Sequence, residues 1–210
     1  MTALRAFLAA DVGEAARRAL GTAAERLARE VRGREVRWAR PETYHLTLRF
    51  LGEIDAERTA PLARAVAEAV AALAPFELRL REVAPFPSPR RPQVIAATVE
   101  PEAPLVELAR AVEAAVVRAG FPADERPFRP HLTLGRVRDR AHPAAATAGP
   151  LEPAPFRVTE VVLYRSELSP EGALHTPVER MPLGATQPRP NHSEGEEVHG
   201  EEHPTARASH

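Results

Sequence analysis

One tetrapeptide, HLTL, occurs twice in this chain, at residues 45–48 and again at residues 131–134. Both copies lie in segments whose apolar residues alternate as they do in β-strands. Successive side chains of a strand point to opposite faces. In each copy the two leucines therefore share one face, and the histidine and the threonine share the other. The repeat thus requires two matching strands, and if the two halves of the chain face each other about a pseudo-twofold axis, both histidines and both threonines meet in one cleft.

Segments with helical spacing of apolar residues separate the predicted strands. The helices are expected over residues 14–31, 61–74 and 105–119. The strands are expected over residues 4–10, 36–38, 44–51, 76–83, 94–99, 131–137, 156–164 and 174–181. Their apolar residues alternate rather than run continuously, which favours antiparallel pairing over a doubly wound parallel sheet. We predict a bilobal α+β fold whose antiparallel sheets, related by a pseudo-twofold axis, face a central cleft and carry helices on their outer faces.

The end of the chain differs from the rest. Residues 1–183 are expected to form one bilobal domain, because neither half has a complete set of elements by itself. Residues 184–210 contain a single large apolar residue and five glutamates, so they bury too little surface to offset the entropy of ordering. We expect a disordered acidic tail. Its His192, His199 and His203 could bind a stray metal ion, but no helix or turn fixes them at ligand spacing.

The composition excludes several kinds of chemistry. All 28 basic residues are arginine, which excludes Schiff-base lysine chemistry and a P-loop lysine. The absence of cysteine excludes disulfides, thiolate zinc sites and cysteine nucleophiles. The net charge of −1 argues against a general nucleic-acid coat. No segment has the pattern of a signal peptide or a membrane span, so we expect a cytoplasmic monomer without a membrane partner.

A cleft lined by His45, Thr47, His131 and Thr133 suits the cleavage of a phosphodiester. Two imidazoles with an ordinary pKa of about 6.5 can divide at neutral pH into one neutral base and one protonated acid. In-line displacement needs both, because one group takes a proton from water and the other protonates the departing alkoxide. The threonine hydroxyls can donate hydrogen bonds to the non-bridging phosphate oxygens. This chemistry needs no metal and no other cofactor.

Three arginines beside the motifs are further candidates for binding the phosphate. Arg129 precedes the second motif, and Arg49 directly follows the first. Because Arg49 stands an even number of positions after the first histidine, it falls on the His/Thr face if the strand stays regular. Arg136 stands an odd number of positions after the second histidine, so it reaches this face only if the strand bulges or ends at Gly135.

At these residues the sequence resembles the two-histidine phosphoesterase superfamily, which is defined by a pair of HxTx motifs. Within it the chain is most similar to the RNA 2′,3′-cyclic phosphodiesterase family, also called the RNA 2′-5′ ligase family. The resemblance covers about residues 3–183 and includes the segments LRAFLA, WARPETYHLTLRFLGE, PFPSPRRPQVI, GFPADERPFRPHLTLGR and LYRSELSPEGALHTPVERMPL.

The resemblance implies metal-free hydrolysis of terminal RNA 2′,3′-cyclic phosphates to 2′-phosphomonoesters, in a cleft that holds both motifs. Carried over, His45 is the general acid that protonates the leaving 3′ oxygen, and His131 is the general base that activates water. Thr47 and Thr133 hold the phosphate. The order of acid and base comes from the family alone, because the symmetry of the motifs cannot assign it. The implied partners are RNA 3′ ends with a 2′,3′-cyclic phosphate, or small cyclic nucleotides.

Other functions are open at the same residues. The site could join or cleave 2′-5′ linkages, or hydrolyse a small cyclic nucleotide. A binding module for RNA ends or nucleotides could keep the cleft without turnover, although the presence of both histidines and both threonines counts against a decayed enzyme. A metal-dependent hydrolase is the third class. Against it, each motif places a threonine beside its histidine, and residues 1–183 contain no HxxxH or HxH spacing.

The remaining candidates have less support. His142 and His175 are expected to be exposed, and in the family an aromatic residue is common where His175 stands. Arg90 and Arg91 could steer an RNA backbone, or they could simply belong to a solvated loop. Trp38 is expected to pack in the core rather than stack on a base. Four phenylalanines are also expected in the core, although one near the cleft could support a nucleobase: Phe7, Phe50, Phe86 and Phe128.

Overall fold

Ten strands and three α-helices form the described part of the chain, which in this computed structural model comprises residues 2–31, 35–138, 149–151, 154–169 and 172–185. The strands are β1 (Ala3–Ala10), β2 (Val36–Trp38), β3 (Leu46–Asp55), β4 (Phe76–Phe86), β5 (Val94–Glu100), β6 (Leu132–Val137), β7 (Gly149–Pro150), β8 (Pro155–Val158), β9 (Glu160–Ser169) and β10 (Gly172–Pro182). The helices are α1 (Gly13–Glu30), α2 (Thr59–Val70) and α3 (Glu102–Arg118), with short 3-10 turns η1 (Pro41–Thr43) and η2 (Ala56–Arg58).

Every helix and strand predicted from the sequence is present, and the α+β class is confirmed. Two boundaries differ in a way that matters for the fold. The predicted strand over residues 156–164 is divided at Thr159 into β8 and β9, which pair with different partners, β4 and β1. The second helix ends at Val70, before the position expected from its apolar spacing.

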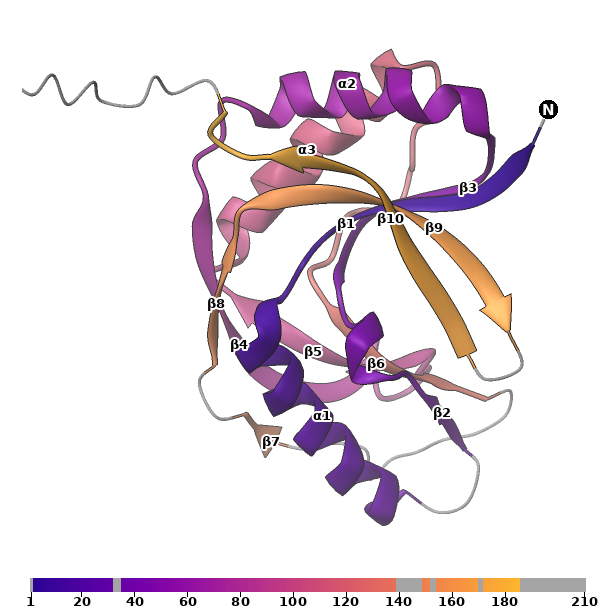
Figure 1. Cartoon of the computed structure of the whole chain (residues 1–210). Coiled ribbons are helices and arrows are strands. Elements are labelled where there is room, and N and C mark those ends of the chain that lie inside the picture. Colours follow the sequence, from indigo (N-terminus) through magenta and orange to yellow (C-terminus); the bar gives the residue numbers. More distant parts are fainter. Residues whose placement is uncertain (1, 32–34, 139–148, 152–153, 170–171, 186–210) are drawn as a thin grey trace, which may run out of the picture.

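The strands form one antiparallel sheet rather than two separate ones (Figure 1). Its order is β10-β9-β1-β3-β6-β5-β4-β7, with β2 added beside β6 and β8 beside β4. The two halves expected from the sequence are the two arms of this sheet, which join where β3 meets β6. A single residue pair, Leu46 with Leu132, makes the junction. Because both leucines occupy the same place in the HLTL repeat, the pseudo-twofold axis passes between the two motifs.

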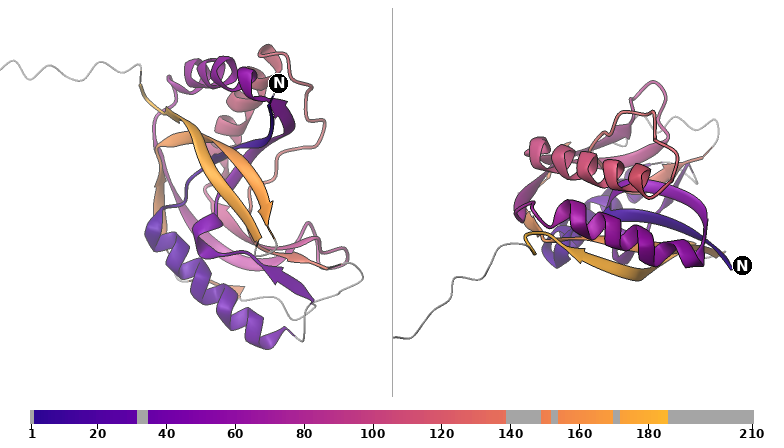
Figure 2. Two further views of the ribbon diagram at one scale, coloured as in Figure 1. Left: turned by 45° about the vertical axis from the view of Figure 1, so that its right-hand side comes forward. Right: turned by 90° about the horizontal axis from the view of Figure 1, so that it is seen from above.

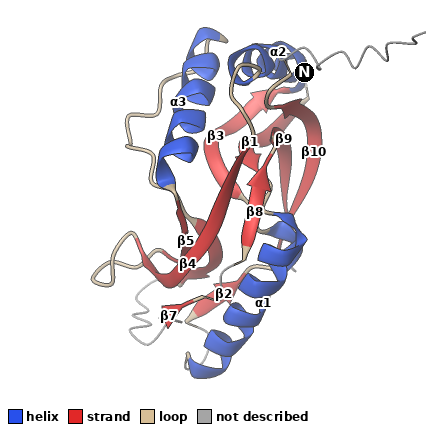
Figure 3. Cartoon of the chain, turned by 90° about the vertical axis from the view of Figure 1, so that its left-hand side faces the viewer, coloured by secondary structure: helices blue, strands red, loops and turns tan. Residues whose placement is uncertain are grey.

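Each arm is covered by a helix that belongs, in chain order, to the other arm. Helix α1 follows β1 but packs against β2, β6 and β8, whereas α3 follows β5 but packs against β3 and α2. Figures 2 and 3 show α2 and α3 together at one end and α1 at the other. This exchange leaves each arm incomplete without the other, which is the physical reason that the arms do not divide into separate domains.

The apolar face of the repeat lies in the core. Leu46, Leu48, Leu132 and Leu134 are all buried, and they belong to one continuous hydrophobic cluster that extends under all three helices. The histidine and threonine of each motif therefore emerge on the face that the helices do not cover.

Some predictions concern residues outside the described ranges. The expected disordered tail falls almost wholly on residues 186–210, which include His192, His199 and His203, and His142 lies in residues 139–148. These predictions stay predictions. Among the residues that are described, no helix is long and apolar enough to cross a membrane.

Candidate active site

The first HLTL motif ends in a β-bulge. The pairing of β3 with β1 passes from Thr47 directly to Arg49, so that Leu48 is an extra residue. Beyond the bulge the alternation of side chains is reversed. Phe50, rather than Arg49, therefore lies on the face of the histidine, where its ring is 6.1 Å from that of Phe7.

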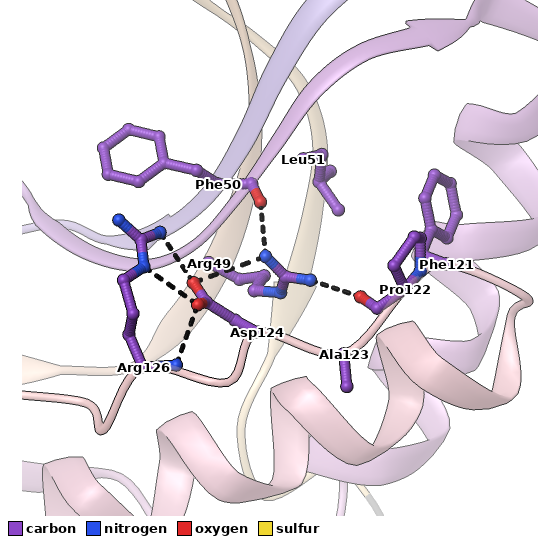
Figure 4. Close-up of a pocket in the computed structure, with 8 residues that line it drawn as sticks. All are labelled: Arg49, Phe50, Leu51, Phe121, Pro122, Ala123, Asp124 and Arg126. Atoms are coloured by element: carbon purple, nitrogen blue, oxygen red, sulfur yellow. Dashed lines mark hydrogen bonds and ion pairs between the residues drawn. The ribbon is translucent and has the colours of Figure 1, made fainter.

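The expectation that Arg49 shares the His/Thr face is therefore wrong. Its guanidinium points the other way, toward α3 and the loop that follows it (Figure 4), and its side chain is 12% exposed. There Nε lies 2.7 Å from Glu113 Oε2 and Nη1 lies 3.5 Å from Asp124 Oδ2. The guanidinium also donates to the carbonyl oxygens of Phe50 and Pro122. Arg49 thus joins β3 to the loop after α3 and is not in position to bind a phosphate beside the histidines.

The second motif ends in an equivalent bulge. Here the bulge turns the nearby arginine toward the His/Thr face instead of away from it. The pairing of β6 with β5 passes from Thr133 to Gly135, which makes Leu134 the extra residue. The bulge that Arg136 needs in order to reach the His/Thr face is therefore present. Arg136 is exposed and makes no ion pair with a carboxylate of the described residues. Only glycine fits at position 135 without a shift of its neighbours, because a Cβ there would lie 2.6 Å from Val36 Cγ1, which is too close.

His45 directly precedes β3, and its ring is fixed on several sides. Its Nδ1 lies 2.7 Å from the carbonyl oxygen of Thr43, and its Nε2 lies 2.9 Å from Thr47 Oγ1. Because a carbonyl oxygen only accepts, Nδ1 carries the proton, and in the neutral ring Nε2 accepts from the Thr47 hydroxyl. The ring stacks on Phe7 at 4.7 Å and meets His175 edge-on at 5.3 Å. The nitrogen left for chemistry is therefore Nε2.

Burial lowers the pKa of His45 from 6.5 to about 4, since the charged imidazolium loses its hydration. The hydrogen bond to the Thr43 carbonyl opposes this effect. Positive charge on His175 and Arg17 lowers the pKa further, and the carboxylate of Asp11 raises it. In the ligand-free protein His45 is consequently neutral at pH 7.

His131 occupies the equivalent place before β6. Its Nδ1 lies 2.8 Å from the carbonyl oxygen of Arg129, and its ring stacks on Phe86 at 4.3 Å. This hydrogen bond selects the same tautomer as in His45, with Nε2 as the free nitrogen. Burial lowers the pKa of His131, and the positive charges of Arg129 and Arg136 act in the same direction, against the hydrogen bond to the Arg129 carbonyl.

The two halves of the site meet at the Leu46–Leu132 pair. Since both leucines point into the core, the histidine and threonine beside each one stand on the opposite face of two neighbouring strands. The structure thus brings together the four residues of the two motifs that the sequence predicted to converge. Arg136 joins them from β6, and its charge acts on His131.

Arg129 lies next to the second histidine rather than directly between the two. Its guanidinium carbon is 4.6 Å from the centre of the Phe86 ring, and its Nη2 is 3.4 Å from the carbonyl oxygen of Pro87. It therefore lies against Phe86, the ring on which His131 stacks, and its positive charge lowers the pKa of His131.

The prediction that His175 is exposed is wrong. From β10 its half-buried ring reaches Phe7 at 4.9 Å and His45 at 5.3 Å, edge-on to both. The sequence contained a signal that could have found it, because the corresponding position in the family commonly carries an aromatic residue. A ring that packs against Phe7 fits that preference.

The phenylalanines divide between core and site. Phe7 is buried, as expected, and Phe128 packs against the core, but Phe50 is 48% exposed, which corrects the prediction for that residue. Phe7 and Phe86 each support one histidine of the pair, a role that their strand pattern did not reveal.

Other candidates lie apart from the pair. Trp38 packs against the core, as expected, and Arg90 and Arg91 are exposed in the loop between β4 and β5. In the described part of the chain, no three histidine, aspartate or glutamate side chains gather as they would around a metal ion.

A pair of HxTx motifs on neighbouring central strands of one antiparallel sheet defines the class of two-histidine phosphoesterases. A profile of the family described as the 2′-5′ RNA ligase superfamily matches residues 17–170 of the chain. The protein belongs to this superfamily, which confirms the resemblance drawn from its sequence.

Several relatives match over most of their length. A protein of Methanothermobacter thermautotrophicus named RNA 2′,3′-cyclic phosphodiesterase is 33% identical over 181 residues, which cover 84% of this chain and 97% of that protein. A protein of Thermus thermophilus with the same name is 36% identical over 68% of this chain and 73% of its own. Among solved structures, a Thermus thermophilus protein superposes with a TM-score of 0.73 at 31% identity, covering 88% of this chain and 100% of its own. Escherichia coli LigT complexed with 3′-AMP superposes with a TM-score of 0.71 at 26% identity, covering 89% of this chain and 100% of its own.

Proposed function

We propose that the protein is an RNA 2′,3′-cyclic phosphodiesterase, which opens a terminal cyclic phosphate to a 2′-phosphomonoester. One observation carries the proposal. Two imidazoles of the same tautomer, each with Nδ1 bound to a backbone carbonyl, stand before neighbouring strands with Nε2 left for chemistry. The relatives named RNA 2′,3′-cyclic phosphodiesterase support this choice of substrate.

The reaction needs one proton to enter and one to leave. Nε2 of His131 accepts a proton from water as the water oxygen bonds to phosphorus, and Nε2–H of His45 protonates the 3′ oxygen as the bond between that oxygen and phosphorus breaks. His45 is neutral in the ligand-free protein, so it must first take up a proton, and this protonation costs free energy. A bound phosphate lowers that cost, because its negative charge stabilises the imidazolium.

Thr47 and Thr133 are proposed to hold the non-bridging phosphate oxygens. In the neutral state the Thr47 hydroxyl donates to Nε2 of His45. Once Nε2 is protonated it no longer accepts, and the hydroxyl is released to donate to the phosphate. Protonation of the acid and binding of the phosphate therefore favour each other at this threonine. Arg136 adds a positive charge on the same face, and Arg129 acts close to His131.

One feature supports His131 as the base and so His45 as the acid. His131 is the less buried of the two, and among the described residues its Nε2 has no partner comparable to Thr47, which leaves that nitrogen available to water.

The same cyclic phosphate occurs in small cyclic nucleotides, which are therefore included as substrates. The protein is proposed to act as a cytoplasmic monomer. The four residues of the two motifs all come from one chain.

The test uses a short RNA that ends in a 2′,3′-cyclic phosphate, incubated with the protein in EDTA. The expected product is a monoester that resists a 3′-specific phosphatase. A product that this phosphatase removes would show cleavage of the other ester bond. Activity that is lost in EDTA and restored by a metal ion would overturn the acid–base mechanism.

A further inference from the structure

His175 belongs to the same face as His45, yet the proposed reaction does not use it. It lies on β10, opposite Ser166 of β9. Figures 1 and 2 show these two strands as a long hairpin, which forms the edge of the sheet beyond β1. The ring of His175 stands almost perpendicular to the rings of His45 and Phe7, at 87° and 80°. These contacts fix the plane of the imidazole beside the reactive pair.

The two nitrogens of His175 differ in their surroundings. Nδ1 is buried and has no hydrogen-bond partner among the described residues. A ligand can therefore reach the ring only through Nε2. A phenylalanine would make the same edge contacts without enclosing an unpaired polar atom, so packing alone does not account for an imidazole at this position.

The charges around His175 favour an anion. Burial lowers the pKa of His175, a backbone hydrogen bond with Leu174 opposes this effect, and the positive charge of Arg136 lowers the pKa further; no carboxylate among the described residues acts on it. The one carboxylate that raises the pKa of His45 among the described residues is that of Asp11, and it is already paired with Arg17. An anion that lies beside His175 and Arg136 is therefore attracted by the charge of Arg136, and it can accept a hydrogen bond from the imidazole through Nε2.

We propose that His175, through Nε2, contacts the phosphodiester on the 5′ side of the terminal nucleotide, so that the site prefers the end of an RNA strand to an isolated cyclic nucleotide. This inference rests on the proposed function. The cyclic phosphate occupies the histidine pair, and the next negative charge on an RNA 3′ end is this phosphodiester. The positive charge of Arg136 acts on both His131 and His175, so it lies close enough to interact with phosphates beside either ring.

The experiment compares two substrates that differ by one phosphate: adenosine 2′,3′-cyclic phosphate, and the same compound with a 5′-phosphate. The wild-type protein is expected to prefer the 5′-phosphorylated compound by on the order of tenfold in kcat/KM, as one charge-assisted hydrogen bond allows. His175→Phe keeps the ring contacts and is expected to abolish this preference, mainly by raising KM for the phosphorylated substrate. Leu174→Gln, at an exposed neighbour on β10, is the control and keeps the preference.

The ratio of the two rates is measured in one preparation, so it does not depend on the fraction of folded protein. An equal loss on both substrates would overturn the inference, because His175 would then act through His45 alone. A preference that persists in His175→Phe, or is absent from the wild type, would overturn it as well. Failure of the proposed function is a separate result, in which the wild-type protein hydrolyses neither compound.

Discussion

Arg49 and Arg136 follow the same tetrapeptide, yet they lie on opposite faces of the sheet. Each strand bulges at the last leucine of its motif, and the residue two places beyond that leucine reaches the site. In the first copy this residue is Phe50, and in the second it is Arg136. A difference of one position between two similar sequences therefore decides whether an arginine lies on the face of the histidines or joins two elements of the fold.

These two arginines make a matched pair of variants. Arg136→Met is expected to raise KM for the cyclic phosphate on the order of tenfold or more, because a charge-assisted contact is lost. Arg49→Met is expected to leave KM nearly unchanged while destabilising the fold, because Glu113 loses its partner and Asp124 keeps only Arg126. Steady-state kinetics and denaturant unfolding separate the two effects. A large KM effect in Arg49→Met would refute the assigned orientation.

The protonation of His45 is directly measurable. Titration followed by NMR is expected to give His45 a pKa of about 4 in the ligand-free protein. Adenosine 2′-monophosphate, an analogue of the product, is expected to raise that pKa, because its negative charge stabilises the imidazolium. A ligand-free pKa of His45 at or above 6.5 would contradict the burial of this ring and its neutral state at pH 7.

At the scale of elements, the bulge of β6 depends on close packing at Gly135. Gly135→Ala places a Cβ 2.6 Å from Val36 Cγ1, which is expected to reduce the free energy of unfolding by about 1–3 kcal/mol. Val36→Ala removes the clashing atom. Denaturant unfolding of both single variants and the double variant should therefore show non-additivity, with the double variant more stable than the sum predicts. Strict additivity would mean that Val36 does not limit the space at this position.

Much of the secondary structure was predictable from the sequence, since apolar periodicity located all three helices and every strand except the short β7, with β8 and β9 predicted as one strand. The bulges were not, because a bulge shifts the alternation without leaving a mark in a pattern such as HLTLRF. Only Gly135 gave a hint in the second copy, and the first copy had none, so the orientation of Arg49 was wrong. His175 was missed for a different reason. Its burial depends on the way the β9–β10 hairpin folds over Phe7, which is a long-range contact.

At the scale of the whole molecule, the buried site makes stability depend on pH. His45 has an unfolded-state pKa of 6.5 and a folded-state pKa of about 4. The unfolded chain therefore takes up a proton first as the pH falls, and the stability contributed by neutral His45 is present above pH 6.5 and lost toward pH 4. A shift of this size corresponds to roughly 3 kcal/mol.

Urea unfolding at a series of pH values tests this linkage. The wild-type free energy of unfolding is expected to fall between pH 6.5 and 4, and His45→Phe, which keeps a ring against Phe7, should show a shallower fall. His131 and His175 contribute in the same direction, so part of the dependence should remain. An identical pH dependence in wild type and variant would contradict the assigned state of His45.

The central claim is that the two motif histidines act as one acid–base pair. Single-turnover hydrolysis of RNA with a 2′,3′-cyclic end, measured for the wild type, His45→Ala, His131→Ala and the double variant, tests it most directly. Each single substitution is expected to lower the rate by roughly 10²–10⁴-fold. The double variant should lose little more, because the two groups work as a unit. A single variant that keeps near wild-type turnover would contradict the claim.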